Sequence, residues 1–392
     1  MMADVRPDPD SGAAGTEWQT AAALRELGPT VDTLWSEDLS HRIRHGNLHY
    51  LLELPIAYQR AMVHQFKTAH YDVVHVNQPH GYLAAMALRR RAPEAVFVHR
   101  SHGFEGRVVA ALAPWRHEMR DPRPVWQRGA SDVLQRLLGF NNRMITTHAD
   151  GHIVSATECS RFLESHHGVD PWRIAVIPQA APAFFHASAP DLDAERACRL
   201  LYVGQFAFFK APFLVARVAQ AVLQQLPAAR FTWVCAQQHH AEAKALFTDA
   251  TVLPRVSFVP WQDQQVLRDL YDAHAIFLFP SLFEGFGKAF IEAMTRGLCV
   301  VASDNGGMKD VIRHGENGIL AETGDVQGMT DACIRLMRSP AEMAAMGSRA
   351  RQTGRRLTWD LVARRTLDFY ERLIELKRET TGNGVSVAGK PR

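Results

Sequence analysis

Cysteine is scarce in this chain, with five in 392 residues and none in a Cys-x-x-Cys pair. They are Cys159, Cys198, Cys235, Cys299 and Cys333. An odd number of scattered cysteines excludes a disulfide framework, and the missing pairs exclude a zinc site built on thiolates. The cysteine content therefore predicts a protein of the reducing cytoplasm.

Long apolar runs are also lacking, because none approaches the roughly 18 residues of a membrane-spanning helix. The first residues show no basic segment followed by an apolar one, so no secretory leader is predicted. A formal net charge of +3 is too small to favour nucleic acid as a partner. It would not repel an anionic substrate or an anionic lipid.

What is present is typical of a folded globular protein, with 47% apolar and 22% charged residues. At 392 residues the chain is long enough for two or three domains of about 150 residues each. We predict two, because the chain repeats one pattern in both halves.

That pattern is a short apolar run followed by a longer helical stretch. The runs of the first half are residues 72–76, 95–99, 151–156 and 173–178, and those of the second half are 200–204, 231–235, 255–259, 275–279 and 298–302. Nearly unbroken, β-branched runs are typical of parallel strands that helices cover on both faces. The predicted fold class is therefore α/β, with two Rossmann-like, doubly wound domains.

The domain boundaries follow from composition. We predict an N-terminal domain over 1–185, a C-terminal domain over 198–357, and a closing helix with a tail over 358–392. The stretch 179–197, rich in Ala, Pro and Asp, is the predicted linker. At the N-terminus "MMADV" is too short for an ordinary first strand. Either that strand is unusually short or the sequence begins downstream of the natural start.

Two glutamates stand out in "PSLFEGFGKAFIEAM", residues 280–294. Glu284 lies in a glycine-rich turn after an apolar run, and Glu292 lies on the helix that follows. Open α/β sheets bind ligands beyond the carboxyl ends of their strands, beside helix N-termini. Carboxylates there would accept hydrogen bonds from neutral hydroxyls, such as those of a sugar. Alternatively, Glu292 pairs with Lys288 or Arg296, each four residues away on the same helix.

A longer stretch resembles the donor-binding region of family 4 glycosyltransferases, which are retaining enzymes of the GT-B fold. It reads "PSLFEGFGKAFIEAMTRGLCVVASDNGGMKDVI" and is followed by "GENGIL" and "TGD". Further similar segments are "SGAAGTEWQ", "RSHGFE", "VIP", "LYVGQFAFFK" and "TW". The resemblance spans nearly the whole chain, and it implies two domains that face each other across a cleft.

The resemblance implies roles for particular residues. Catalytic roles would fall to Glu284, near the donor sugar, and to His102, at a strand end. Donor binding would fall to Gly12, Gly15, Gln205, Lys210, Phe286, Gly287, Lys288 and Glu292. Lys210 would neutralise the diphosphate of the donor and Glu292 would bind its ribose. Without the resemblance, a lone lysine is usually a surface residue and a lone histidine is usually structural.

The chain departs from the family pattern at Gln205, where many members carry an arginine beside the diphosphate. A glutamine can donate hydrogen bonds but cannot balance charge. We therefore expect weaker electrostatic attraction for the donor at this position.

No metal and no cofactor are predicted, and a nucleotide-diphosphate sugar would serve as co-substrate. The two Asp-x-Asp matches, Asp8/Asp10 and Asp191/Asp193, lie in a proline-flanked turn and in the linker, and neither follows a strand. The predicted function is thus a metal-independent, retaining transfer of a hexose-type sugar to a hydroxyl acceptor, in the synthesis of a glycan, a glycolipid or a glycosylated metabolite. A sugar-nucleotide epimerase of the same fold, or a non-catalytic sugar-nucleotide-binding protein, would fit the same residues.

The acceptor is not predicted, although residues 88–128 form a basic, tryptophan-containing stretch. Interleaved Arg and Trp would suit a lipid-phosphate acceptor at the inner face of a membrane, with peripheral membrane contact. An ordinary solvated surface would have the same composition.

Overall fold

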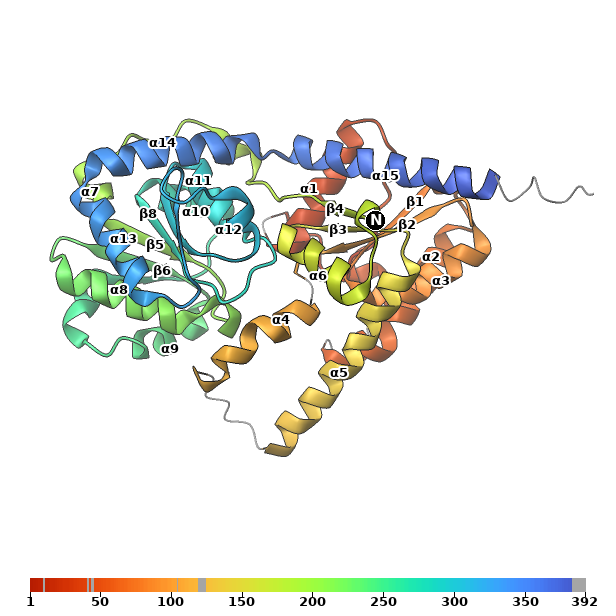
Figure 1. Ribbon diagram of the computed structural model, residues 1–392, viewed down its shortest axis with the longest axis horizontal. Coiled ribbons are helices and arrows are strands. Elements are labelled where there is room, and N and C mark those ends of the chain that lie inside the picture. Colours follow the sequence, from red (N-terminus) through yellow and green to blue (C-terminus); the bar gives the residue numbers. More distant parts are fainter. Residues whose placement is uncertain (10, 41, 44–45, 104, 119–124, 383–392) are drawn as a thin grey trace, which may run out of the picture. The chain divides into compact units, whose positions relative to one another are not determined.

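The computed structural model of the protein describes residues 1–9, 11–40, 42–43, 46–103, 105–118 and 125–382 (Figure 1). Asp10 and the predicted tail beyond residue 382 lie outside these ranges. The chain divides into two compact units. The first comprises Met1–Ala110, Arg120–Ile177 and Asp360–Arg392, and the second comprises Ala111–Met119 and Pro178–Trp359.

The first unit contains a parallel four-stranded sheet. Its strands, in spatial order, are β1 (Val73–Asn77), β2 (Val96–Ser101), β3 (Gly151–Val154) and β4 (Ile174–Val176). Every residue of β2 and β3 is buried, as expected for strands covered on both faces. The predicted short first strand is reduced to Met2, which forms single parallel bridges with Leu34 and Val76.

The helices of the first unit are labelled in Figure 1. They are α1 (Ala13–Glu26), α2 (Leu54–Gln65), α3 (Tyr82–Arg91), α4 (Glu105–Leu112), α5 (Val125–His148), α6 (Thr157–His167) and α15 (Trp359–Gly382). A π-helical turn, η2 (His49–Glu53), leads into α2. α15 is the predicted closing helix. It packs so tightly on β3 that a Cβ at Gly151 would lie 2.5 Å from Leu373 and 2.7 Å from Phe369.

The second unit contains a parallel six-stranded sheet in the order β10-β9-β8-β5-β6-β7. Its strands are β5 (Arg199–Val203), β6 (Arg230–Val234), β7 (Val256–Val259), β8 (Ile276–Phe279), β9 (Cys299–Ser303) and β10 (Ile319–Ala321). All nine apolar runs named above form strands, whereas β10 was not predicted. The order reverses between β5 and β8, and this is the point of a doubly wound sheet where ligands bind.

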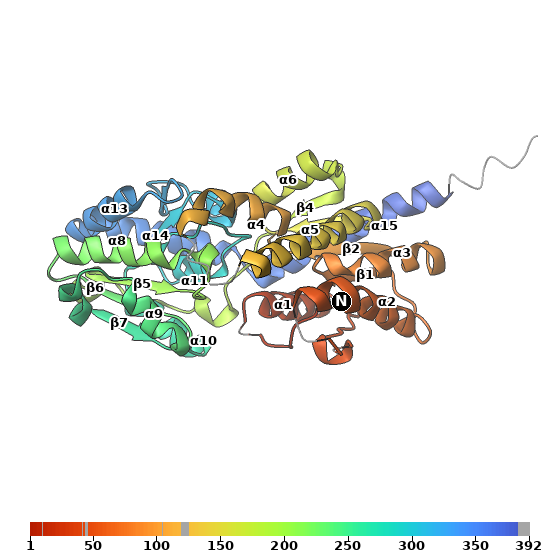
Figure 2. The ribbon, with the colours of Figure 1, turned by 90° about the horizontal axis from the view of Figure 1, so that it is seen from below.

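The helices of the second unit are α7 (Ala194–Ala197), α8 (Pro212–Gln225), α9 (His240–Ala245), α10 (Gln264–Asp272), α11 (Lys288–Thr295), α12 (Gly306–Val311), α13 (Val326–Arg338) and α14 (Pro340–Arg356). α8 and α13 lie side by side along one side of the sheet (Figure 2). Buried aliphatic and aromatic side chains from strands and helices join in one large core. None of the helices that the structure describes, in either unit, has the length and apolar character needed to span a membrane.

Residues 111–118 belong to the second unit, although in sequence they fall within the range 1–185. Trp115 packs over Gly324, where a Cβ would lie 2.0 Å from the indole ring. Glu118 receives two hydrogen bonds of 3.0 Å from Arg217 on α8. This segment is therefore anchored on the second unit by both an aromatic contact and an ion pair.

Candidate functional site

Two of the predicted site residues meet at the point where the strand order of the second unit reverses. Lys210 ends a short turn, η7 (Phe208–Lys210), after β5, and Glu284 lies in the loop after β8. Their side chains are 2.5 Å apart although the residues are 74 positions apart in the sequence. Glu284 also accepts a hydrogen bond of 2.8 Å from Ser281. A buried carboxylate with an adjacent ammonium group thus lies at the carboxyl ends of the strands.

Glycines hold the loop that carries Glu284. Gly306, at the start of α12, has φ +57°, and a Cβ there would lie 2.4 Å from the carbonyl oxygen of Glu284. Gly287 has φ +94° at the N-cap of α11, and a Cβ there would lie 2.9 Å from Phe279. Only glycine tolerates both the positive φ and such close approach. The backbone around Glu284 is therefore held by packing on both sides.

Glu292 is buried on α11, one turn after Lys288. Tyr271 donates a hydrogen bond of 3.0 Å to one of its oxygens, and Lys288 lies 3.9 Å from the other. Burial, and after it the Glu292 carboxylate, raises the pKa of Tyr271 well above its usual value, so the phenol keeps its proton. Of the two alternative pairings, the structure contains the one with Lys288.

Arg296 has different partners. Its guanidinium binds both carboxylate oxygens of Asp272 at 2.7 Å and the carbonyl oxygens of Phe185, Ala187 and Ser188. It therefore ties the start of the second unit to α10 and α11, and its role is structural.

The remaining predicted donor residues of this unit lie on the same loops. Phe286 is buried against Phe290, and the backbone from Phe286 to Lys288 passes directly into the N-terminus of α11. Gln205 follows β5 and its side chain is exposed. The neutral amide therefore stands where a positive charge was expected from the family pattern.

In the first unit, the predicted turn over Gly12–Gly15 is the N-terminus of a helix. Gly12 is the N-cap of α1, and Gly15 lies in the first helical turn. The N–H of Gly15 donates to the hydroxyl of Ser11 at 3.1 Å. This N–H group thus already has an acceptor on its own chain.

His102 follows β2, as predicted, and lies against α1. Its Nε2 is 2.9 Å from Oε1 of Glu17, a buried residue that the sequence analysis did not single out. Glu17 also lies 3.5 Å from His75 and 3.7 Å from Arg100. Burial would raise the pKa of Glu17, but Arg100, His102 and His75 together lower it to about 2. The carboxylate is therefore ionised at neutral pH.

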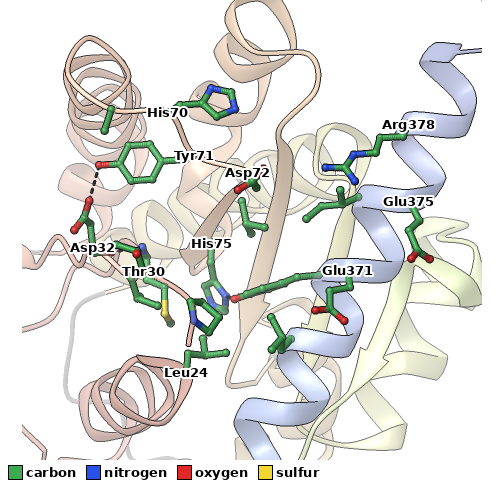
Figure 3. Close-up of a pocket in the computed structure, with 18 residues that line it drawn as sticks. Leu24, Thr30, Asp32, His70, Tyr71, Asp72, His75, Glu371, Glu375 and Arg378 are labelled. Carbon is green, nitrogen blue, oxygen red and sulfur yellow. Dashed lines mark hydrogen bonds between the residues drawn. The ribbon is translucent and has the colours of Figure 1, made fainter. Parts of the chain in front are cut away.

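The first unit also contains a cavity of about 750 Å³ (Figure 3). It lies ahead of β1, beside Asp32, Tyr71 and Asp72, and reaches to the C-terminal part of α15 at Arg378. Tyr71 donates a hydrogen bond of 2.7 Å to Asp32 at its edge. None of the predicted site residues lines it. Within the ranges that the structure describes, no three His, Cys, Asp or Glu side chains are grouped as metal ligands.

Comparison with known proteins identifies the family of the chain. The family model "Glycosyltransferase Family 4" matches residues 17–181, and "Glycosyl transferases group 1" matches residues 197–339. D-inositol 3-phosphate glycosyltransferase of Mycobacterium avium is 30% identical over 333 residues, which are 80% of this chain and 73% of that protein. The chain spans little more than half the length of three Rhodococcus relatives, 54 to 56%.

Solved structures share the fold. Sucrose-phosphate synthase from Thermosynechococcus elongatus has a TM-score of 0.75 at 22% identity, covering 96% of this chain and 98% of that one. The catalytic domain of starch synthase IV from Arabidopsis thaliana, bound to ADP and acarbose, has a TM-score of 0.68 at 14% identity over 95% and 98% of the two chains. The fold is that of the GT-B class. The chain belongs to the family 4 glycosyltransferases.

Proposed function

We propose that this protein transfers a sugar from a nucleotide-diphosphate sugar to a hydroxyl acceptor, with retention of configuration and without a metal ion. The observation that carries the proposal is the contact between Lys210 and Glu284 at the carboxyl ends of β5 and β8. It places a cation suited to a diphosphate beside a carboxylate suited to sugar hydroxyls.

Each group has a distinct task in this proposal. Lys210 neutralises the diphosphate as it departs, and the N-terminus of α11, with the backbone of Phe286, Gly287 and Lys288, adds further positive potential. Glu284 accepts hydrogen bonds from the donor sugar. Glu292, already held by Tyr271, accepts hydrogen bonds from the ribose.

The proposed reaction breaks the bond between the sugar and the diphosphate and forms a bond from the sugar to the acceptor oxygen on the same face. The acceptor proton moves to the departing phosphate. Glu284 is engaged by both Lys210 and Ser281, so it serves as a hydrogen-bond acceptor and not as a covalent nucleophile. The positive charges at the donor stabilise the leaving group in the manner that a metal ion would otherwise provide.

The test is to incubate the purified protein with a panel of nucleotide sugars and candidate acceptors, in excess chelator. We expect release of nucleoside diphosphate, and a product with the anomeric configuration of the donor. Epimer formation would identify the sugar-nucleotide epimerase instead, and binding without turnover would identify a non-catalytic binding protein. Loss of activity in chelator, restored by magnesium or manganese, would contradict metal independence.

We also propose that the protein works in the cytoplasm, with peripheral contact to the inner face of a membrane. Leu48, Leu52 and Ile56 are 52%, 54% and 40% exposed at four-residue spacing, and the exposed Arg60 follows four residues later. Apolar side chains beside a cation favour an anionic lipid surface. Sedimentation with vesicles containing anionic lipid should therefore exceed sedimentation with neutral vesicles, and Leu52→Glu should reduce it. Equal sedimentation with both vesicles would contradict the contact.

A further inference from the structure

Glu17 occupies an unusual position in the first unit. Its side chain is only 3% exposed, on the second turn of α1, and it lies among side chains from β1 and β2. One carboxylate oxygen is near His102 and Arg100, and the other is near His75. A carboxylate in such a place is costly unless its charge is balanced.

The contacts continue beyond Glu17 to the C-terminal helix. His75 lies between Glu17 and Tyr370 of α15, with its Nδ1 in a short hydrogen bond to the tyrosine hydroxyl. Burial lowers the pKa of His75 to about 3, so its ring is neutral near pH 7. Burial also raises the pKa of Tyr370, so the hydroxyl remains protonated. The tyrosine then donates to Nδ1, which leaves the ring hydrogen of His75 on Nε2, facing Glu17.

Ordinary hydrogen bonding does not fully satisfy this cluster. Arg100 donates to Thr20 at 3.0 Å through one nitrogen, yet its Nε and its other terminal nitrogen have no aligned acceptor among the described residues. Oε1 of Glu17 has a close contact with His102, whose Nε2 lies 2.9 Å away. Buried polar groups without hydrogen-bond partners do not stabilise a fold, so a functional reason for this cluster is expected.

We propose that Glu17 is a positioning residue, which orients the His102 ring and keeps its hydrogen on Nε2. The proposal rests on the proposed function and on the catalytic role that the family resemblance implies for His102. An ionised carboxylate 2.9 Å from Nε2 favours the ring form with hydrogen on that nitrogen. In the neutral ring the lone pair is then on Nδ1. Glu17 acts on the chemistry only through His102.

The test compares Glu17→Gln with Asp150→Asn. Gln is almost the same size as Glu, so the packing should persist, while the lost charge leaves Arg100 without its carboxylate and lowers stability. Asp150 is a matched control, because it accepts hydrogen bonds of 2.7 Å from the Phe97 backbone and 2.9 Å from Lys377 within the same unit. We expect kcat to fall about ten- to a hundredfold in Glu17→Gln, with KM for the nucleotide sugar nearly unchanged. Asp150→Asn should lower the unfolding temperature and leave kcat unchanged.

Two further measurements distinguish a Glu17 that positions His102 from a Glu17 that only stabilises the fold. Nitrogen-15 spectra of the imidazoles should show the Nε2–H form of His102 in the wild type and a mixed population in Glu17→Gln. In a His102→Ala background, Glu17→Gln should cause no further loss of kcat, because both act on one interaction. Glu17→Asp keeps the charge on a shorter side chain. The kcat of this variant should therefore lie between that of the wild type and that of Glu17→Gln.

An unchanged His102 spectrum, or an equal loss of kcat with and without His102, would overturn the assignment. A wild-type protein that turned over no nucleotide sugar would contradict the proposed function instead. In that case the imidazole spectra alone would still decide whether Glu17 fixes the His102 ring.

Discussion

The two units bury polar and charged side chains in different ways. In the second, Glu284 lies at the carboxyl end of an apolar sheet and Glu292 on the helix that follows, and each has a donor from another loop or helix. In the first, polar side chains occupy the sheet itself, including His75 in β1, His99 in β2 and His152 in β3. Protonating a group at a ligand site on the edge of a sheet changes the free energy of unfolding little. Protonating a histidine inside a sheet lowers that free energy, because the charge is buried.

The largest effect should come from Glu284→Ala in the second unit. We expect transfer to fall by at least about a thousandfold, because the variant loses a charge aimed at the reaction centre. The fold should remain, since Glu284 lies in a loop outside the apolar core. Steady-state kinetics and circular dichroism measure the two quantities. Glu342→Ala, which removes one partner of an exposed ion pair, is the control. Wild-type turnover in Glu284→Ala would refute the site.

Arg296→Ala tests whether the other buried charge of the second unit is structural. Removing the guanidinium leaves Asp272 and three carbonyl groups without their donor, so we expect the free energy of unfolding to fall by about 3–5 kcal/mol. Urea denaturation measures it. Arg313→Ala, whose side chain is 81% exposed, should change it by less than about 0.5 kcal/mol. Similar small changes in both variants would show that the buried contacts contribute little.

Acid should weaken the first unit through its buried histidines. Burial lowers the pKa of His99 to about 3, below the ordinary value of 6.5. The unfolded chain therefore binds the proton first, and this stability is present above pH 6.5 and is lost as the pH falls toward 3. Between pH 7 and pH 5 the loss should be about 2 kcal/mol for His99. Urea denaturation of His99→Leu should show a pH dependence smaller by that amount. The same pH dependence in both proteins would contradict a neutral, buried His99.

Lys210→Ala should weaken the binding of nucleoside diphosphate more than the binding of nucleoside. We expect nucleoside diphosphate to bind about ten- to a hundredfold more weakly, because a charge-assisted contact is lost, while nucleoside binding stays nearly constant. Isothermal titration calorimetry measures both affinities. An equal loss for the two ligands would mean that Lys210 does not bind the diphosphate.

The smallest effect should come from Gln205→Arg, which restores the charge common in the family. Because the side chain at this position is exposed, the added attraction should strengthen nucleoside diphosphate binding by less than about tenfold. The gain should shrink as salt is added. A weaker affinity in the variant would show that Gln205 makes a contact that arginine cannot replace.

The fold was largely predictable because its strands are nearly unbroken apolar runs. The exception is β10, Ile319–Ala321, whose apolar run stops at Glu322 after three residues, whereas the run of the equally short β4 continues to Ile177. The sequence predicted that Glu292 pairs with either Lys288 or Arg296, because both lie four residues from it. It could not decide between them, because Arg296 binds Asp272, which lies 24 positions away in the sequence.

Glu17 could not be identified from the sequence, although it lies two residues after Gly15. Its importance comes from His75, His102 and Tyr370, which three separate parts of the chain supply. Sequence patterns report local spacing and motifs, whereas a buried charge cluster is defined by contacts across the fold.

The most direct test of the account is hydrogen exchange of the protein with saturating ADP, UDP, GDP, CDP and dTDP in turn. The account predicts that at least one nucleoside diphosphate protects peptides of the second unit that cover residues 205–212 and 281–295, and that Lys210→Ala weakens this protection. Protection confined to residues 69–73, at the cavity of the first unit, or no protection by any of the five, would contradict the donor site.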